Sequence, residues 1–519
     1  MIFSFLLGSL LFKLASMPLI LLLCWRFWRF TILPRFRPEE PNELPYWIPY
    51  VGHAISYFRD SFSVLTSGRM HFNDNREPFS ITLAGQTVYI LTGPADVTAA
   101  YRNTASLSMD VFLQDLMCGF EITPDGTRRV YEEQGKTNEV KILSDNPSGK
   151  SLVHLMVDWF RIQLSPGDNL NKLGQVTCDY FEEALRWENI NDPLYVLSSS
   201  TENYKDISLY HFCEQLLLGA AVRSFFGDVL IEGSPNLHKD FLAFDEVSWK
   251  LLYQYPKAFS GDMHNAKDKI VDALEKYFAL PLSSRPDANW FVRHQEAEMR
   301  ALGVSPRDMA RMIGLIYWVI NTNAYKLLFW MTSYMLLDKT LVDNSRTELQ
   351  ACFNPDGSLN LPSLQTQSKY VTALFLETMR MSNSSASARF VTSDTQINQY
   401  VLRAGRRLLI PYRQLHLNTA VFGDNAAEFD INRFLDDPKL AKNPSYRPFG
   451  GGKSYCPGRF LAKQELLQVL AYLLTRFEVE IAPGAGDKFP RMDELKPGIG
   501  IVGPVQGDDL VVRIRPRKG

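Results

Sequence analysis

The stretch FGGGKSYCPGR, residues 449–459, decides the fold of this chain. Its three consecutive glycines let the backbone turn tightly and approach a flat ligand closely. Cys456 ends that turn just before a predicted helix, where the positive end of the helix dipole favours a thiolate over a thiol. A cysteine thiolate pushes electron density onto a haem iron and favours cleavage of an O–O bond. The stretch therefore predicts that Cys456 is the axial ligand of a haem iron.

The glycine-rich stretch has two other interpretations, an ordinary turn and a phosphate-binding loop. Lys453 and Ser454 follow the glycines, as a lysine and a hydroxyl residue do in a phosphate-binding loop. That motif also needs a strand at a set spacing before the glycines, and the sequence predicts none there. The pattern of a phosphate-binding loop is therefore not met.

The same stretch resembles the haem-binding signature of the cytochrome P450 superfamily. That signature is a phenylalanine, two residues, a glycine, three residues, a cysteine, one residue and a glycine, and it is matched by Phe449, Gly452, Cys456 and Gly458. The resemblance extends from a proline-rich segment near the N-terminus to the C-terminus. It implies the cytochrome P450 fold, mainly α with small β-sheets, and a b-type haem (heme b, iron protoporphyrin IX). It also implies electrons from NADPH through NADPH-cytochrome P450 reductase.

Two further segments carry the resemblance in the expected order. Glu377 and Arg380 match the family's ExxR motif on an apolar predicted helix. The segment EFDINRF, residues 428–434, resembles the family's FxxxRF segment. It implies that Arg433 joins Glu377 and Arg380 in a buried network that supports the haem. Such a network needs all its members, because removing one leaves a buried charge without a partner.

The residues expected around the haem propionates depart from the family pattern. Ser454 stands two residues before the cysteine, where most members carry a basic residue that holds a propionate. The resemblance therefore points to Arg389, which follows a stretch rich in serine and alanine, as the propionate ligand. The family's Trp-x-x-x-Arg on an early helix is not evident. Trp159 and Arg161 are close to it but misspaced, so Arg161 is a second candidate.

The long helix expected over residues 308–337 departs further from the family. Members carry Ala/Gly-Gly-x-Asp/Glu-Thr over the haem, and the aligned stretch here is INTNA, residues 320–324. Asn323 replaces the acid and Ala324 the threonine of a pair that relays protons when dioxygen is split. We expect Asn323 and Thr322 to be catalytic residues, helped by ordered water or a substrate hydroxyl. The alternative is that Asn323 is a structural amide that relieves a bend in the helix.

This departure also narrows the resemblance to one branch of the family. Together with Trp318, Phe329 and Trp330, it resembles the branch of sterol hydroxylases and prostacyclin synthase. Within that branch the sequence is similar to fungal members that tailor terpenoid, steroid or alkaloid products in secondary metabolism. The branch contains hydroxylases and also an isomerase that needs neither reductase nor dioxygen. The sequence therefore leaves the reaction type open.

The first 24 residues are nearly all apolar, with Lys13 as the only charge. A helix of about 20 apolar residues spans a bilayer, and the arginines and tryptophans that follow are typical of a cytoplasmic flank. The sequence predicts a transmembrane signal anchor over residues 1–24, a basic and proline-rich linker over 25–52 and a cytosolic haem-thiolate catalytic domain over 53–519. We expect this single-pass protein in the endoplasmic reticulum membrane. The alternative is a cleaved signal peptide, but no small-x-small site precedes the bulky residues 25–30.

Composition excludes several classes of protein. The 519 residues have a net charge of −2 and are 46% hydrophobic, so a large core can form, and neither global disorder nor nucleic-acid binding is indicated. The six cysteines are scattered without a CxxC pair, which is typical of thiols in a reducing compartment.

Shorter patterns predict the remaining elements. Residues 79–94 predict two strands around a turn at 84–86, and residues 459–476 predict a helix directly after the cysteine. The other predicted elements are a helix over 364–381 and strands near 389–391, 408–410, 477–481 and 510–514.

The leading hypothesis is a haem-thiolate monooxygenase that uses NADPH, a flavin reductase and dioxygen to oxidise a hydrophobic small molecule. Three basic residues near the cysteine are either part of the reductase-binding surface or ordinary solvated charges: Lys453, Arg459 and Lys463. A second hypothesis, motivated by Asn323 and Ala324, is a haem-thiolate isomerase or lyase of peroxides or epoxides. A third is a non-enzymatic haem carrier or sensor, against which the complete motif set argues.

Overall fold

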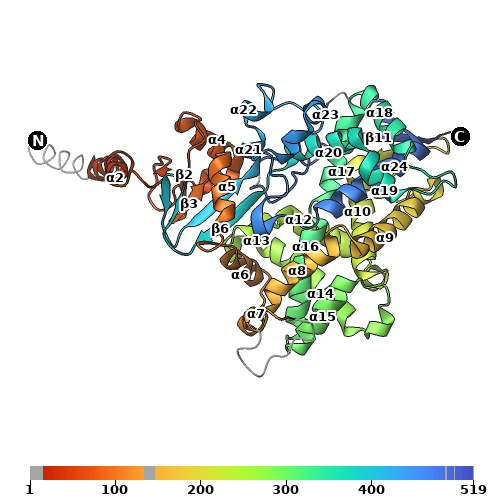
Figure 1. Cartoon of the computed structure of the whole chain (residues 1–519), viewed down its shortest axis with the longest axis horizontal. Helices are drawn as coiled ribbons and strands as arrows, with labels where there is room; N and C mark the ends of the chain where they lie inside the picture. The colour runs from red at the N-terminus through yellow and green to blue at the C-terminus, as the bar shows by residue number, and fades with distance from the viewer. Residues whose placement is uncertain (1–15, 134–145, 485–487, 496, 518–519) are drawn as a thin grey trace, which may run out of the picture.

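The computed structural model describes residues 16–133, 146–484, 488–495 and 497–517. The chain is mainly helical with small sheets, as the sequence predicts. Figure 1 shows the largest sheet toward the end from which the N-terminal helix projects, and most helices in the broader remainder. The helices of the body are α3 (Ala54–Arg59), α4 (Ser61–His71), α5 (Pro94–Arg102), α6 (Asp110–Gly119), α7 (Pro124–Tyr131), α8 (Leu152–Leu164), α9 (Asp168–Ala184), α10 (Leu209–Phe226), α11 (Val229–Gly233), α12 (Leu237–Val247), α13 (Trp249–Leu252), α14 (Gly261–Ala279), α15 (Trp290–Ala301), α16 (Pro306–Asn321), α17 (Ala324–Leu336), α18 (Lys339–Gln350), α19 (Leu361–Gln367), α20 (Lys369–Ser382), α21 (Tyr412–His416), α22 (Thr419–Phe422), α23 (Asn432–Asp436) and α24 (Arg459–Arg476).

In the described part of the chain, the strands form three small sheets, with the orders β1-β2-β3-β9-β6-β4, β10-β11-β5 and β7-β8. The hairpin predicted within residues 79–94 is confirmed, because β2 pairs antiparallel with β3 from Phe79 opposite Ile90. Its turn residues Ala84 and Gly85 both have positive φ. The strands are β1 (Asn42–Glu43), β2 (Phe79–Leu83), β3 (Gln86–Ile90), β4 (Leu107–Ser108), β5 (Lys205–Ser208), β6 (Ala386–Val391), β7 (Thr395–Ile397), β8 (Tyr400–Leu402), β9 (Arg407–Pro411), β10 (Phe477–Ile481) and β11 (Val511–Pro516).

The helix predicted over residues 364–381 is two helices. α19 ends at Gln367, and α20 begins at Lys369. The carboxylate of Glu348 accepts hydrogen bonds at 2.9 Å from the backbone N–H groups of residues 370 and 371. These N–H groups belong to the first turn of α20, where no intrahelical acceptor exists. Glu348 therefore stabilises a new helix start that the apolar pattern conceals.

The single long helix predicted over residues 308–337 is also wrong, because the structure has a break in it. α16 ends at Asn321, and α17 begins at Ala324. The predicted N-terminus is confirmed, since Ser305 Oγ accepts from the backbone N–H of Asp308 at 3.1 Å.

Hydrogen bonds to other elements stabilise the break. Asn323 has φ −117° and ψ −39°, and its Oδ1 accepts from the backbone N–H of Ile501 at 2.8 Å. Thr322 donates its hydroxyl proton to Asp245 on α12. Such tertiary partners replace hydrogen bonds that an unbroken helix would make. Because they come from distant parts of the chain, hydrophobic periodicity does not reveal them.

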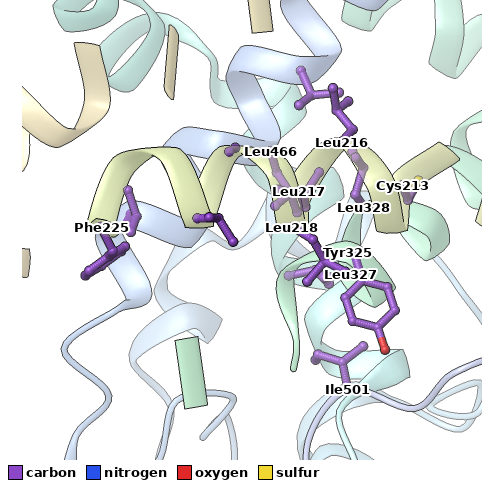
Figure 2. Close-up of a cluster of buried hydrophobic side chains, with 14 of the residues drawn as sticks. Cys213, Leu216, Leu217, Leu218, Phe225, Tyr325, Leu327, Leu328, Leu466 and Ile501 are labelled. Carbon is purple, nitrogen blue, oxygen red and sulfur yellow. The ribbon is translucent and has the colours of Figure 1, made fainter. Parts of the chain in front are cut away.

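A core helix, α10, lies at the centre of the helical body. Its leucines 216–218 are all buried, and a helix that is apolar on all sides is a buried helix. Figure 2 shows these leucines in one cluster with Leu328 of α17 and Leu466 of α24. The helix that follows the break and the helix that follows Cys456 therefore share one apolar core.

The apolar N-terminal helix reaches further than the sequence predicts. Among the described residues, Ser16–Phe36 is the one helix long and apolar enough to cross a membrane. Residues 1–15 of the predicted anchor lie outside the described part of the chain. Residues 25–36, which we expected in the linker, are helical, with a π-helical segment at Trp28–Ile32. Figure 1 shows this helix projecting from the body.

Several contacts join this helix to the start of the body. Arg29 Nε donates to Glu43 Oε2 at 2.7 Å, and Glu43 lies in β1. Arg26 donates to the carbonyl of Tyr46. The Tyr46 ring lies 5.1 Å from the Phe30 ring, measured between centroids. An ion pair, a backbone hydrogen bond and an aromatic contact therefore hold the helix against the body.

Asn323→Ala should lower the free energy of unfolding by about 1–3 kcal/mol, because it leaves the buried N–H of Ile501 without an acceptor. Asn321→Ala is the matched control, since Nδ2 of Asn321 donates at 2.8 Å only to Tyr317 O in its own helix. Denaturant unfolding of both variants measures the difference. Equal losses would contradict a specific role for the bond between residues 323 and 501.

Candidate functional site

Cys456 lies in a tight loop between a 3₁₀ turn, Gly452–Ser454, and the start of α24. Its backbone N–H donates to Phe449 O at 3.0 Å and closes the loop. Gly450 and Gly452 have φ of +80° and +61°, which other residues rarely adopt. A Cβ on Gly452 would also lie 2.9 Å from the carbonyl oxygen of Tyr101 on α5. The glycines therefore form a turn that is pressed against α5.

The chain ahead of this turn is not a strand. A 3₁₀ helix, Pro438–Lys442, and irregular backbone lead to Phe449. A phosphate-binding loop follows a strand and opens a helix directly. The structure therefore argues against that interpretation of the glycine-rich stretch.

The Cys456 thiol can act as a single metal ligand. All six cysteines are free, and Cys456 is partly buried. Burial raises the pKa of its thiol, whereas the backbone N–H groups of Gly458 and Arg459 lower it. Burial outweighs the expected effect of the helix N-terminus, so the thiol would become a thiolate only with a bound metal cation in place of its proton. Within the described ranges no three His, Cys, Asp or Glu side chains cluster as metal ligands, so a lone thiolate suits a metal that a prosthetic group carries.

The structure brings Glu377, Arg380 and Arg433 together in one buried network. Arg380 donates to the two oxygens of Glu377 at 2.8 and 2.7 Å, and both side chains are fully buried. Arg433 Nε lies 3.3 Å from Glu377 Oε1, and the backbone N–H of Asp430 donates to the same oxygen at 2.9 Å. One carboxylate therefore balances two guanidinium groups.

The same guanidinium groups bind the backbone between α21 and α23. Buried carbonyl groups need hydrogen-bond donors, and this segment has little regular structure to provide them. The carbonyl acceptors of Arg380 are those of His416 at 3.1 Å, Ala426 at 2.5 Å and Glu428 at 2.9 Å, and the acceptors of Arg433 are those of Phe422 and of Asn425 at 2.6 Å.

Arg389 is a buried cation for which the described residues provide no carboxylate. It lies in β6 with 8% of its surface exposed. It donates to Ser387 Oγ and Ala388 O, both at 2.7 Å, and to Ser454 Oγ. A buried charge without a counter-ion is costly, so this site calls for an anion. Ser454, which replaces the usual basic residue, is instead a hydrogen-bond partner of Arg389.

These residues fit a haem. A lone thiol ends a glycine turn that permits close approach, and a buried cation that bonds to the same loop lacks an anion. Cys456 could hold the iron, and Arg389 could hold a carboxylate of the porphyrin.

Arg161, the second candidate for a propionate, supports the cysteine loop. Its Nη2 donates to Lys453 O at 2.9 Å, and its Nη1 donates to Asp158 at 3.3 Å. The neighbouring Trp159 is buried, with its ring against Trp290. Arg161 is therefore bound to a loop carbonyl and to an acid.

The three basic residues near Cys456 differ in exposure. Lys453 is exposed. Arg459 lies over the Tyr455 ring at 4.4 Å from its centroid and donates to Cys456 O at 2.8 Å. Lys463 is partly buried, and burial lowers its pKa. Only Lys453 of these three presents a free surface charge.

Thr322 and Asn323, the expected catalytic residues, both have protein partners, as the description of the break shows. Sequence reasoning missed Asp245, which accepts from Thr322, and Lys326, which also donates to Asp245. Lys326 is the single lysine of a largely apolar helix, which is a signal, whereas Asp245 is one of three acids on α12 and does not stand out. A buried charge requires a partner, but the sequence does not reveal which one.

Comparison with known proteins finds similarity to one family. A family model described as Cytochrome P450 matches residues 322–504, which run from the helix break past Cys456. Glu377, Arg380 and Arg433 lie within the match. Over these residues the chain is similar to the cytochrome P450 superfamily. The haem-binding signature and the ExxR motif therefore both lie within the region that matches the family model.

Relatives in this superfamily extend the similarity over nearly the whole chain. Cytochrome P450 monooxygenase poxD of Penicillium oxalicum is 23% identical over 92% of this chain and 94% of that protein. Cytochrome P450 7B1 of Mus musculus is 24% identical over 86% of this chain and 85% of its own. Cholesterol 7-alpha-monooxygenase of Cricetulus griseus is 22% identical over 95% of this chain and 97% of that protein. The predicted resemblance to fungal P450s and to sterol hydroxylases is confirmed, at 22–24% sequence identity.

Glu377→Gln should destabilise the fold by about 3–5 kcal/mol, because it removes the negative charge that two buried guanidinium groups share. Glu465→Gln is the matched control. Glu465 is also buried, and burial raises its pKa to about 8, so its carboxyl is already neutral at pH 7. Denaturant unfolding at pH 7 should give a large loss for the first variant and a small loss for the second. Similar losses would mean that shape, not charge, matters at residue 377.

His416 should make the fold sensitive to acid. Burial, with the charges of Arg380 and Arg413, lowers its pKa to about 3. Unfolded chains bind a proton at histidine below about pH 6.5. The folded form does not, so stability should fall by about 1.4 kcal/mol per pH unit as the pH drops from about 6 to about 4.

His416→Gln removes that titration. It keeps an acceptor for the backbone N–H of Arg447, which now donates to His416 Nε2 at 3.1 Å. Unfolding free energies at several pH values should give a shallower acid slope for the variant. Identical slopes would show that other groups alone cause the acid sensitivity.

Proposed function

We propose that this chain is a haem-thiolate monooxygenase that takes electrons from NADPH through NADPH-cytochrome P450 reductase and uses dioxygen to oxidise a hydrophobic small molecule. The observation that carries the proposal is the Cys456 thiol in its glycine turn, beside a buried Arg389 that lacks a counter-ion. The superfamily implies a haem, a reductase and a small-molecule substrate in general. Two of the relatives above are named as monooxygenases.

Each candidate residue has a role in this proposal. Cys456 binds the haem iron, and Arg389 binds a propionate. The bound haem would supply the binding and reduction of dioxygen. The loop around the thiolate is shaped by Phe449, Gly452 and Gly458, and the chain that leads to it is supported by Glu377, Arg380 and Arg433.

The substrate in this proposal is a terpenoid, steroid or alkaloid intermediate of secondary-metabolite biosynthesis. The support is the similarity to a fungal P450 and to an enzyme named for cholesterol. Hydrophobic molecules of this kind partition into membranes, so a membrane-bound enzyme meets them at high local concentration.

We place the protein in the endoplasmic reticulum membrane as a single-pass protein with a cytosolic catalytic domain after residue 52. The support is the apolar helix Ser16–Phe36 and the arginines that follow its apolar first part, at positions 26, 29 and 35 within the helix and 37 just after it. Positive residues next to a membrane span remain on the cytoplasmic side.

A second candidate function is a haem-thiolate isomerase or lyase of peroxides or epoxides. The observation that favours it is the pair Asn323 and Ala324, which replaces the family's acid and threonine. Asn323 Oδ1 is already bonded to the backbone of Ile501, so it is not a free proton carrier. A haem carrier or sensor remains a third candidate, without a specific observation in its favour.

Membranes that hold the full chain should give, after reduction and addition of carbon monoxide, the absorption band typical of a thiolate ligand. Cys456→Ser should abolish that band, and Cys352→Ser, at another buried cysteine, should keep it. The band should remain with the membranes after an alkaline carbonate wash. A missing band in the unmutated chain would reject the proposal and both alternatives.

Sterols and terpenoids incubated with the same membranes separate the two enzymatic candidates. Hydroxylated product should require NADPH, the reductase and dioxygen. Conversion of a peroxide or an epoxide without any of the three would favour the isomerase.

A further inference from the structure

Arg459, the first residue of α24, holds its guanidinium group against two aromatic rings. Its Cζ lies 4.4 Å from the centroid of the Tyr455 ring and 4.2 Å from that of the Phe460 ring. Arg459 and Phe460 are partly buried, whereas Tyr455 is exposed. The negative faces of aromatic rings attract a guanidinium group, and more strongly where water is excluded. The two rings therefore fix the position of a charge that would otherwise move freely in solvent.

The guanidinium group is directed at the backbone of Cys456. Its Nη1 donates to the carbonyl oxygen of Cys456 at 2.8 Å. Within the ranges that the structure describes, no carboxylate forms an ion pair with Arg459. The group is close enough to the Cys456 thiol to interact with it electrostatically. Arg459 therefore presents an unpaired positive charge to the candidate iron ligand.

The side chain of Arg459 provides something that the backbone of the loop cannot. The backbone N–H groups of Gly458 and Arg459 face the Cys456 sulfur, and any residue except proline would supply them at these positions. The positive charge depends on the side chain alone. Because the charge is partly buried and held in place, solvent screens its field less than the field of a mobile surface charge.

Lys453 provides a comparison, because it stands three residues before Cys456 and Arg459 stands three residues after it. Lys453 is exposed. An exposed ammonium group is strongly hydrated, and salt screens its charge. The two cations are equally far from the ligand along the chain, but Arg459 is the one that is held by rings and bonded to the carbonyl of Cys456.

A cation beside an axial thiolate changes the electron balance at the iron. Reduction of a ferric haem adds one negative charge to the centre, so a nearby positive charge stabilises the reduced form. Hydrogen bonds and charges around the axial ligand are among the means by which a protein sets the potential of a haem. The charge of Arg459 should therefore raise the reduction potential of an iron bound by Cys456.

We propose that Arg459 is a positioning residue that sets the reduction potential of the haem iron. Its bond to the carbonyl of Cys456 orients the ligand residue, and its charge, held by the two rings, stabilises the reduced iron–thiolate centre. The iron then accepts its first electron more readily from the flavin of a reductase. This inference rests on the proposed haem-thiolate function, since it requires Cys456 to bind the iron.

Arg459→Gln is the direct test, because an amide can still donate to the Cys456 carbonyl but carries no charge. Arg459→Lys keeps the charge and so serves as the conservative rescue. The matched control is Lys453→Gln, which removes one positive charge at the exposed position on the other side of the cysteine. Together the three variants separate the charge from the hydrogen bond, and a held charge from a solvated one.

The readout is the reduction potential of the purified full chain, followed by absorbance in a titration with redox dyes. It needs neither a substrate nor turnover. At the solution potential where half of the unmutated protein is reduced, the ratio of reduced to oxidised iron should fall about threefold or more in Arg459→Gln. Arg459→Lys should recover most of that loss, and Lys453→Gln should leave the ratio unchanged.

Tyr455→Leu tests the rings without removing the charge. Loss of one ring loosens the guanidinium group and admits water, so the potential should depend more strongly on salt than in the unmutated protein. Tyr204→Leu is the matched control, because the Tyr204 ring packs against Arg513 at 3.8 Å in another part of the fold. The potential of each variant is measured at low and at high sodium chloride.

The outcomes distinguish failure of this inference from failure of the proposed function. If the unmutated protein gives no thiolate band with carbon monoxide, the proposed function fails. If the band is present and Arg459→Gln keeps the unmutated potential, the inference is overturned while the proposed function stands. A loss that Arg459→Lys does not recover would also overturn it, because the charge would not be the cause. If Arg459→Gln does not fold or bind haem, Tyr455→Leu decides, and a salt dependence equal to that of Tyr204→Leu would contradict the inference.

Discussion

The carboxylate of Glu377 balances two buried guanidinium groups, and the irregular chain segment between α21 and α23 depends on that balance. Arg380 and Arg433 bind carbonyl groups of an irregular segment that has few backbone partners of its own. Further along the chain, Tyr446 donates to the carbonyl of Leu376 on α20 at 2.8 Å. The chain that leads into the cysteine loop is therefore fixed to the helix that carries Glu377. The position and backbone pairing of the chain that leads to Cys456 therefore depend on one ion-pair network.

The two sides of the proposed haem site are built on different principles. On the Cys456 side, local sequence sets the geometry, because the glycine turn, the cysteine and α24 follow one another in the chain. On the side where the family pattern expects the other face of the haem, the helix break at residues 322–323 is held by α12 and by the chain around Ile501. The first side can be recognised from a short motif. The second is assembled from three segments that are far apart in the sequence.

This contrast explains what could be predicted from the sequence. The hairpin of β2 and β3, the bounds of α24 and the order of Glu377, Arg380 and Arg433 follow from local patterns and motif spacing. The helix break was not predictable, because the acceptors and donors that stabilise it lie in α12 and beyond residue 500. Asp245 shows the limit best: a buried acid in a helix indicates that a partner exists, but only the fold reveals Lys326 and Thr322 as its partners.

In a protein anchored as proposed above, the contacts between the N-terminal helix and β1 would have a consequence for encounters in the plane of the membrane. A domain on a flexible linker reorients freely, and it loses that rotational freedom each time it docks with another membrane protein. Here Arg29 is hydrogen-bonded to Glu43, and Arg26 to the carbonyl of Tyr46. Rotation of the body relative to the N-terminal helix is therefore restricted before any encounter. The body would then diffuse with a nearly constant tilt and offer the same face to each partner it meets, which lowers the entropic cost of a productive collision.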